Sequence, residues 1–275
     1  MQDKKINPFL KWPGGKRWIP DELVKQFPTP KVYIEPFLGS GAIFWKLKPE
    51  KAILSDINSE LIEVYNVMKD YPIELSEKLM FHQRKHNKEY YYKMRKMKPR
   101  TEINRAARFI YLNRTCFNGM YRVNEKGEFN VPIGTKNNCI YDLDMFSTYS
   151  MILKNINIIS CDFEKTIAMS EEGDLIFADP PYAMTQGDNF IKYNDHLFTW
   201  EDQKRLLTSL VDAREKGVNI VVTNASCKDI EEMYYKEGFY IWEKERICSI
   251  SGKIEKRKLI KELLITSFKL EEKRG

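Results

Sequence analysis

A carboxylate, two prolines and an aromatic ring stand together in Asp179-Pro180-Pro181-Tyr182, directly after the apolar run Leu175-Ile-Phe-Ala178. The apolar run predicts a buried strand. The prolines end it, because proline lacks the N–H that a sheet ladder needs and fixes an extended backbone. In an α/β protein this presents the carboxylate and the ring at the carboxyl edge of the sheet, where ligands bind. The alternative is a plain strand-ending turn, with Asp179 as a cap and Tyr182 packed at the rim.

These residue types suit methylation of a planar amino group. The exocyclic nitrogen of adenine is a weak nucleophile, because its lone pair is delocalised into the ring. Hydrogen bonds from this amino group to the Asp179 carboxylate and the Pro180 carbonyl would draw the nitrogen toward tetrahedral geometry. Tyr182 would stack on a base that has been turned out of the duplex. A sulfonium donor carries its own activation, so we expect no metal.

A second set of residues has the order of a nucleotide-binding turn. Residues 31–35 predict a short strand, and Glu35-Pro-Phe-Leu-Gly-Ser-Gly41 leads from it into a helix. Glycines there let the backbone approach a ligand and leave helix N–H groups facing it. A second strand, residues 51–54, ends before Asp56, which fits either a ribose hydroxyl or a helix N-cap. The third glycine of the dinucleotide fingerprint is absent, which disfavours a dehydrogenase without eliminating it.

Near the N-terminus, Lys11-Trp-Pro-Gly-Gly-Lys16 combines an aromatic ring, a double glycine and two lysines. Trp12 is suited to lie on a ligand, and Lys16 to reach a carboxylate or phosphate. Core packing of the tryptophan and an ordinary glycine turn explain the same residues.

Basic residues concentrate in residues 81–126, where 13 Lys or Arg stand against 3 acidic residues, although the whole chain carries only +6. Tyrosines and asparagines interleave with them, as contacts to phosphates and bases require. This distribution favours nucleic acid as the partner over a merely solvated helix face. His82 and His86 lie one helical turn apart without a third ligand, so we expect them on an exposed helix face.

The remaining pattern predicts an α/β core interrupted by a helical, basic insertion. Further strands are expected at residues 156–160, 174–178, 218–223, 239–247 and 259–268, and Thr199 is suited to cap a helix ending near Glu215. Helices fill residues 72–114, with Pro72 in a first turn and a break at residues 99–101. Residues 115–138 indicate an ordered loop or hairpin. Residues 188–196 suggest a loop over the site, and the basic residues 249–258 a loop that touches DNA phosphates or only solvent.

Composition indicates the class of protein and its cellular compartment. The hydrophobic content of 43% supports a substantial core, no apolar run has the length of a membrane span, and the first five residues are polar. The five cysteines are odd in number and form no CxxC, which indicates free thiols in a reducing compartment, so we expect the cytoplasm.

Taken together, Lys-Trp-x-Gly-Gly-Lys, Glu-Pro-Phe-x-Gly-x-Gly, an insertion and Asp-Pro-Pro-Tyr resemble the Dam family of DNA adenine methyltransferases, in its alpha order of motifs, over roughly residues 8–269. The resemblance implies a Rossmann-like S-adenosylmethionine-dependent methyltransferase sheet, mixed and seven-stranded with the last strand antiparallel. It assigns residues 1–58 and 152–275 to the catalytic, donor-binding domain and residues 59–151 to a helical target-recognition domain.

The resemblance also implies roles for individual residues. Catalysis falls to Asp179, Pro180 and Tyr182. The family's contacts to S-adenosylmethionine fall on Trp12, Lys16, Phe37, Gly39, Gly41, Asp56 and Asp179. In the recognition hairpin, residues 117–132, Arg122 reads a guanine edge, as its forked donors do well. The other implied DNA contacts are Lys11 to the outer guanine, Met120 and Pro132 to bases through apolar groups, and Phe117 and Asn118 inserted near the extruded adenine.

The implied target is duplex GATC, methylated after base flipping. Phe117 and Met120 stand where relatives often carry Tyr and Leu. We expect a monomer that acts on double-stranded DNA, is not associated with a membrane and has a cognate restriction endonuclease, if any, only as a functional partner. Two alternatives stay open: an RNA adenine or protein-amide methyltransferase, which shares the Pro-Pro-Tyr element, and a non-catalytic DNA-binding module.

Overall fold

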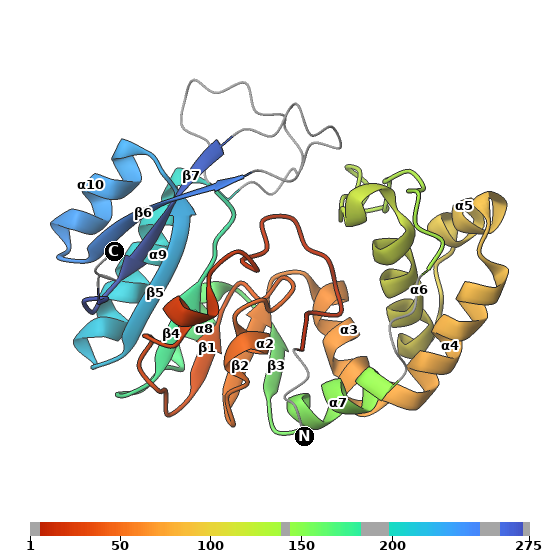
Figure 1. Cartoon of the computed structure of the whole chain (residues 1–275), viewed down its shortest axis with the longest axis horizontal. Helices are drawn as coiled ribbons and strands as arrows, with labels where there is room; N and C mark the ends of the chain where they lie inside the picture. The colour runs from red at the N-terminus through yellow and green to blue at the C-terminus, as the bar shows by residue number, and fades with distance from the viewer. Residues whose placement is uncertain (1–5, 139–143, 183–197, 248–258, 272–275) are drawn as a thin grey trace.

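A mixed seven-stranded sheet organises the chain, in the strand order β3-β2-β1-β4-β5-β7-β6 (Figure 1). The computed structural model describes residues 6–138, 144–182, 198–247 and 259–271. β1, β2, β3, β4 and β5 run parallel, and the last strand, β7, is antiparallel, as predicted; it lies between β5 and β6. The strands are β1 (Tyr33–Glu35), β2 (Ala52–Asp56), β3 (Asn157–Ser160), β4 (Leu175–Ala178), β5 (Asn219–Ala225), β6 (Tyr240–Ile247) and β7 (Leu259–Thr266).

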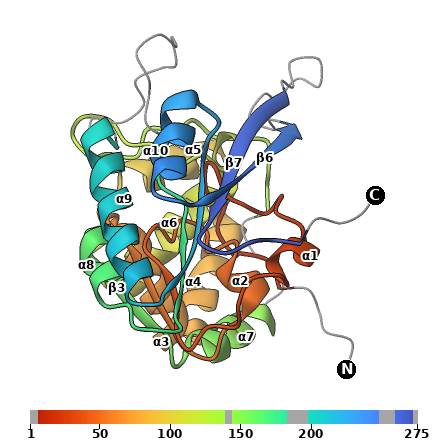
Figure 2. The same ribbon diagram turned by 90° about the vertical axis from the view of Figure 1, so that its left-hand side faces the viewer.

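Side chains of the central strands alternate between the two faces of the sheet. Tyr33 and Leu175 belong to the core on one face, whereas Ile34 and Ile176 belong to the core on the other. The first core packs under α2 (Phe44–Leu47) and α3 (Ser59–Asp70), and the second under α8 (Phe163–Ala168), α9 (Trp200–Glu215) and α10 (Lys228–Lys236). Figure 2 shows α8 and α9 on the opposite side of the molecule from α1 (Asp21–Val24) and α2.

Polar side chains fix the starts of the helices that border the site. Asn58 is the N-cap of α3, because its side chain accepts a hydrogen bond from Leu61 N at 3.1 Å. Thr199 and Asp202 form a reciprocal capping box at the start of α9, which confirms the predicted helix from Thr199 to Glu215. Asp56 is therefore not the N-cap of α3, and its carboxylate has other partners.

The insertion after α3 forms a helical unit beside the sheet, at the right of Figure 1. It contains α4 (Pro72–Lys85), α5 (Lys88–Lys96) and α6 (Glu102–Thr115), and α7 (Asp144–Leu153) returns the chain to β3. Pro72 occupies the first turn of α4, and residues 97–101 separate α5 from α6, as expected. α3 packs against both β2 and α6, so it joins the helical unit to the sheet.

Residues 116–134 form the predicted irregular hairpin. Isolated antiparallel bridges join Cys116 to Ile133 and Val123 to Phe129. A 3-10 turn, η1 (Phe117–Gly119), bends the first arm, and Asn118 and Gly119 have φ values of 54° and 65°. Gly119 is needed there, because a Cβ at this position would lie 2.2 Å from Cδ of Lys11. The turn therefore fixes the hairpin against the N-terminal segment.

The expectation that His82 lies on an exposed helix face is wrong. Its ring is buried, stacks on Tyr111 and shares a 2.7 Å hydrogen bond between Nδ1 and the Tyr90 hydroxyl. Burial lowers the pKa of His82 to about 4, so the ring is neutral at physiological pH. His86 Nδ1 contacts the Tyr111 hydroxyl at 2.8 Å. The two histidines hold α4 against α6.

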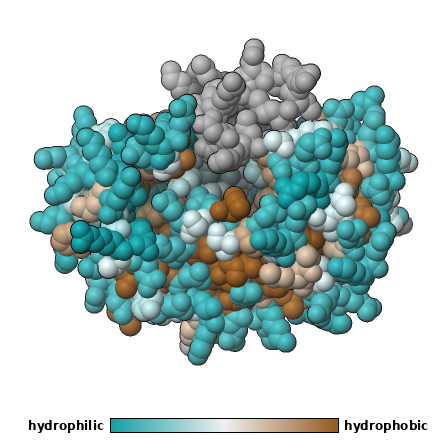
Figure 3. Space-filling view, turned by 180° about the vertical axis from the view of Figure 1, so that it is seen from behind, coloured by the Kyte–Doolittle hydropathy of each residue, from teal (hydrophilic) through white to brown (hydrophobic). Residues whose placement is uncertain are grey.

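The surface of the described residues, their helices and their cysteines show the following features. Seen from behind, it is mainly hydrophilic, with hydrophobic side chains gathered near its centre (Figure 3). No helix in the described ranges is both long and apolar enough to cross a bilayer. Cys116, Cys161 and Cys227 are free thiols. Cys139, Cys248 and the loops predicted at residues 188–196 and 249–258 lie outside the described residues.

We expect Thr199→Ala to lower the free energy of unfolding by about 1 kcal/mol, because it removes the hydroxyl that caps α9. Urea denaturation followed by circular dichroism measures this change. Thr208→Ala, at an exposed interior position of the same helix, is the matched control and is expected to leave stability unchanged or slightly raised. Equal losses in the two variants would contradict the assigned cap.

Candidate active site

One large cleft opens at the carboxyl ends of β1, β2 and β4. Its volume is about 1960 Å³. Its lining comes from separate parts of the chain: residues 12–16, 35–40, 42–43, 56–60, 121–128, 130, 161–163, 177, 179–182, 198, 199 and 202. The motifs predicted from the sequence therefore meet in one place. The recognition hairpin forms one of its walls.

Asp179 lies at the centre of this cleft, at the end of β4. Its Oδ1 receives the Lys16 ammonium at 2.8 Å and the Thr223 hydroxyl at 2.8 Å. Nζ of Lys16 also donates to the Gly14 carbonyl at 2.7 Å. Lys16 is only 2% exposed and Asp179 20%, so their ion pair is largely removed from water. Among the described residues nothing donates to Oδ2 of Asp179, which leaves that oxygen available to a ligand in the cleft.

The electrostatics of the cleft favour basic carboxylates. Burial raises the pKa of Asp179 above its ordinary value, although Lys16 and Thr223 oppose the rise. Burial also raises the pKa of Glu35 to about 8, against the hydrogen bond of 2.8 Å from the Tyr33 hydroxyl to Glu35 Oε2. Asp179 is therefore a stronger hydrogen-bond acceptor than an exposed aspartate.

The two prolines place the rest of the catalytic motif around Asp179. Pro180 is buried, Pro181 is exposed, and β4 ends before both. The ring of Tyr182 lies with its centroid 5.1 Å from Nζ of Lys16, a cation–π distance. The motif thus lines the cleft as predicted, with a carboxylate and an aromatic ring beside one buried ammonium.

Asp56 fixes the glycine turn at the other end of the cleft. Its Oδ2 accepts from Gly39 N and its Oδ1 from Asn58 N, both at 3.0 Å. Gly39 and Gly41 have φ values of 47° and 61°, which favour glycine. A side chain at Gly39 would also collide with Trp12, because a Cβ there would lie 2.7 Å from Cδ1 of the indole. Trp12, Gly39 and Asp56 therefore lie together, whereas Gly41, in the same turn, does not line the cleft.

Trp12 packs between the glycine turn and the recognition hairpin. Its ring stacks on Tyr121, with centroids 5.1 Å apart, and Tyr121 donates from its hydroxyl to Glu60 Oε2 at 3.0 Å. Phe109 of α6 extends the stack, 5.1 Å from Tyr121. The indole thus connects the two walls of the cleft.

An aromatic group lines the same end of the cleft as Asp56. Phe37 stacks on Phe163 at 5.4 Å and meets Phe198 edge-on at 5.6 Å. Ile57, next to Asp56, lines the cleft with 76% of its surface exposed. A carboxylate bordered by apolar surface is what a nucleoside requires, with ribose hydroxyls on the acid and the base among the rings.

Of the residues expected to read DNA, only Arg122 lines the cleft. Its Nε donates to Asn130 Oδ1 at 2.7 Å across the hairpin. The backbone of Lys11 is held by the side chain of Asn113 on α6: Lys11 N donates to Asn113 Oδ1 at 2.9 Å, and Asn113 Nδ2 donates to the Lys11 carbonyl at 2.8 Å. Burial and the neighbouring Lys136 lower the pKa of the Lys11 ammonium to about 8. The others lie outside the cleft lining on the hairpin: Phe117, Asn118 and Pro132 exposed, and Met120 half-buried.

Several residues at this site escaped the sequence analysis. Thr223 and Glu262 reach Asp179 and Lys16 from β5 and β7, and both lie in strands that were predicted, but strand pairing was not assigned. Phe163 follows Asp162 directly after β3, the same strand-end signal that drew attention to Asp56. Asn130 was included only as part of the hairpin, and its bond to Arg122 depends on cross-strand register.

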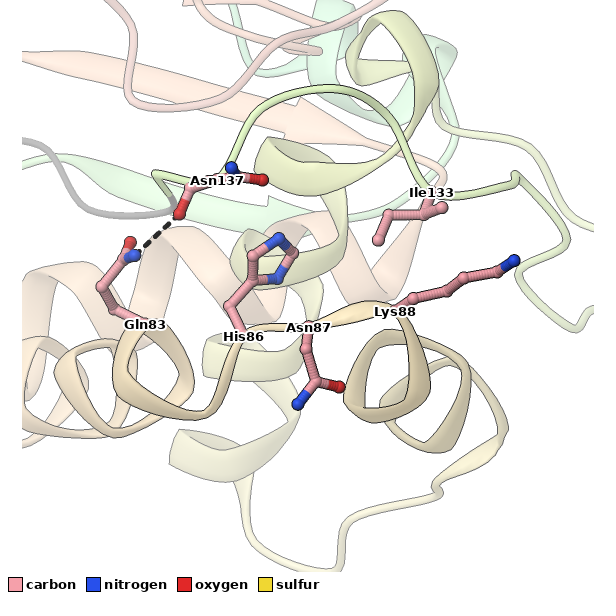
Figure 4. A pocket seen from close by; sticks show the side chains of 6 residues that line it. All are labelled: Gln83, His86, Asn87, Lys88, Ile133 and Asn137. Carbon is pink, nitrogen blue, oxygen red and sulfur yellow. Dashed lines mark hydrogen bonds between the residues drawn. The ribbon is translucent and has the colours of Figure 1, made fainter.

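A second cavity, of about 470 Å³, lies in the helical unit (Figure 4). Gln83 lines it from α4 and His86 from the residue after that helix, and Gln83 Nε2 donates to the Asn137 carbonyl at 2.7 Å. The other lining residues are Asn87, Lys88, Ile133 and Asn137. None of these residues lines the large cleft, so the two cavities are separate.

Comparisons with known proteins agree with this geometry. The family model described as D12 class N6 adenine-specific DNA methyltransferase matches residues 12–250. The chain is 40% identical to the type II methyltransferase M1.LlaDCHI of Lactococcus lactis subsp. cremoris, over 98% of each chain. It is 38% identical to a DNA adenine methylase of Haemophilus influenzae, over 94% of this chain and 93% of that one. It is 36% identical to the type II methyltransferase M.MjaIII of Methanocaldococcus jannaschii, over 96% and 99%.

We expect Lys16→Met to lower the free energy of unfolding at neutral pH by about 3–5 kcal/mol, because it leaves the buried Asp179 carboxylate without its cation. The loss should shrink as the pH falls, because the unpaired carboxylate then takes up a proton. Chemical denaturation between pH 5 and 8 measures both effects. Lys204→Met, which removes an exposed ion pair with Glu201, is the control and should cost less than about 1 kcal/mol. A pH-independent loss for Lys16→Met would argue against the ion pair as its cause.

Proposed function

The chain belongs to the D12 class of N6 adenine-specific DNA methyltransferases, and from this premise we propose that it transfers the methyl group of S-adenosylmethionine to N6 of adenine in duplex GATC. The observation that carries the proposal is the single cleft in which the Asp56 end, the Asp179-Pro-Pro-Tyr182 motif and the recognition hairpin all take part. Such a cleft can hold a nucleoside donor and an extruded base side by side.

The donor end of the cleft suits S-adenosylmethionine. Asp56 is proposed to accept hydrogen bonds from the ribose, while Phe37, Phe163 and Ile57 surround the adenine ring. The turn of Gly39 and Gly41 lets the backbone approach the donor closely. Trp12 and Lys16 border this site from the N-terminal segment: Trp12 lies over Gly39, and Lys16 acts through its ion pair with Asp179. S-adenosylmethionine supplies an electrophilic methyl group on a sulfonium, so no metal is required.

Asp179 is proposed to activate the target amino group. Its Oδ1 is held by Lys16 and Thr223, so Oδ2 is the oxygen that accepts a hydrogen bond from N6–H. The Pro180 carbonyl accepts the second N6–H, and Tyr182 stacks on the flipped base. Both contacts draw the nitrogen toward tetrahedral geometry and withdraw its lone pair from conjugation with the ring. The N6 proton released after transfer passes to Oδ2 of Asp179 or to water.

The hairpin wall is proposed to read the target. Arg122 is oriented by Asn130 and faces the cleft, which suits a bidentate contact to a guanine edge. The exposed Phe117 and Asn118 are placed to enter the duplex beside the flipped adenine, and Met120 and Pro132 to touch neighbouring bases. Lys11 is proposed for the outer guanine. GATC is the site that this arrangement and the resemblance of the hairpin favour.

The division of labour follows the same proposal. Residues 1–58 and 152–275 form the catalytic domain, and residues 59–151 the recognition domain, which α3 attaches to the sheet. The chain acts as a monomer in the cytoplasm, and a cognate restriction endonuclease, if any, is a functional partner only. RNA or a protein amide is the competing substrate class, since the cleft itself would admit any flat amide or amine.

Asp179→Asn should abolish methyl transfer to a GATC duplex, lowering the rate at least about a hundredfold, because the amide cannot replace the charged acceptor. Incorporation of a radiolabelled methyl group measures the rate, and calorimetry should show that S-adenosylmethionine still binds. RNA of the same sequence and a glutamine peptide serve as competing substrates. Transfer by the wild-type chain to either of these, and none to DNA, would refute the proposed substrate.

Arg122→Ala should lower kcat/KM on GATC by about 5–150-fold, the size of one lost bidentate guanine contact. Replacing the contacted guanine by 7-deazaguanine removes the N7 acceptor. The wild-type chain should then slow, whereas Arg122→Ala should treat both substrates alike. Lys126→Ala, at the exposed hairpin tip, is the control and should weaken all substrates uniformly. Equal sensitivity of wild type and Arg122→Ala to 7-deazaguanine would remove Arg122 from the recognition of that base.

A further inference from the structure

Glu262 is a buried carboxylate on β7 that faces the same ammonium as Asp179. It is 1% exposed, and its Oε2 lies 3.7 Å from Nζ of Lys16, opposite the 2.8 Å contact from Nζ to Asp179 Oδ1. β7 pairs with β5, so Glu262 lies beside Ala225 and close to Thr223, which donates to Asp179. Three distant segments therefore bring two carboxylates to one ammonium.

A shared ammonium neutralises each carboxylate less than an exclusive partner would, because its charge acts on both. We propose that Glu262 is a positioning residue for methyl transfer: by sharing Lys16 with Asp179, it keeps Asp179 a strong hydrogen-bond acceptor for the N6 amino group. The inference rests on the proposed function, since it concerns the same amino group. Glu262 does not touch the substrate and acts on Asp179 through Lys16.

The other groups around Asp179 are consistent with this role. The negative charge of Glu262 raises the pKa of Asp179, in the same direction as burial, whereas Lys16 and Thr223 lower it. Glu35, on β1, has a pKa of about 8 and is mostly protonated at neutral pH, with Tyr33 donating to it. Tyr182 faces Lys16 through its ring. Glu262 is therefore the second carboxylate in contact with the Lys16 ammonium.

Glu262→Gln tests the proposal, since glutamine keeps the shape of the side chain and removes its charge. Single-turnover methyl transfer to a GATC duplex should slow by about tenfold at neutral pH, with KM for DNA unchanged. The acid limb of the rate should move to lower pH, because Lys16 then acts on Asp179 unopposed. Glu243→Gln, an exposed carboxylate on β6 paired with Lys261, makes the same change in net charge and should alter neither quantity.

Carboxyl-¹³C NMR of aspartate-labelled protein, without donor or DNA, gives a second readout. The Asp179 signal, assigned by its loss in Asp179→Asn, should titrate at lower pH in Glu262→Gln than in the wild type. Thr223→Val should move the titration the opposite way, because it removes a donor to Oδ1. An unmoved midpoint, or a slower rate with an unmoved acid limb, overturns the proposal and leaves Glu262 a structural residue.

Glu262→Asp covers the case in which Glu262→Gln does not fold. It keeps the charge but withdraws it from Lys16, so a smaller shift in the same direction is expected, and no shift overturns the proposal. If the wild-type chain methylates no DNA, the proposed function fails. The NMR titration still decides separately whether Glu262 sets the proton affinity of Asp179.

Discussion

The buried ion pair between Lys16 and Asp179 is the constraint on which the rest of the site depends. Lys16 lies before the first strand, whereas Asp179 follows the fourth, so the pair anchors the N-terminal segment across the carboxyl edge of the sheet. Once that segment is anchored, Trp12 lies on Gly39 and Lys11 reaches α6. An ion pair so far from water is stabilising only when its remaining hydrogen-bonding capacity is satisfied, and the Gly14 carbonyl supplies the needed acceptor.

The glycine turn and the hairpin are linked by the contacts of Trp12 and Tyr121. Trp12 rests on the glycine turn with one edge and stacks on Tyr121 of the hairpin, and Tyr121 is tied to Glu60 at the start of α3. Aromatic stacking and the Tyr121–Glu60 hydrogen bond therefore hold the hairpin beside the glycine turn and the start of α3. In the proposed function, a flipped base meets Asp179 while Arg122, on the same hairpin, contacts the duplex.

The fold was largely predictable because its signals are local. The apolar runs mark each strand, Pro72 marks the start of α4, and the Thr199 cap marks α9. Motif spacing likewise placed Asp56 and Asp179 at one edge of the sheet. His82 was misplaced because its burial depends on Tyr111, on another helix. Glu262 was missed for the same kind of reason: the antiparallel return of β7 beside β5 carries no signal in the sequence around it.

Asp56 connects the glycine turn to the start of α3, the helix that leads into the insertion. One oxygen accepts from Gly39 in the donor turn and the other from Asn58, whose own side chain caps α3. This helix therefore starts three residues after the carboxylate that holds the glycine turn. α3 in turn packs against α6, and the hairpin begins directly after α6. The hydrogen bonds of Asp56 thus connect the glycine turn to the helices that carry the hairpin.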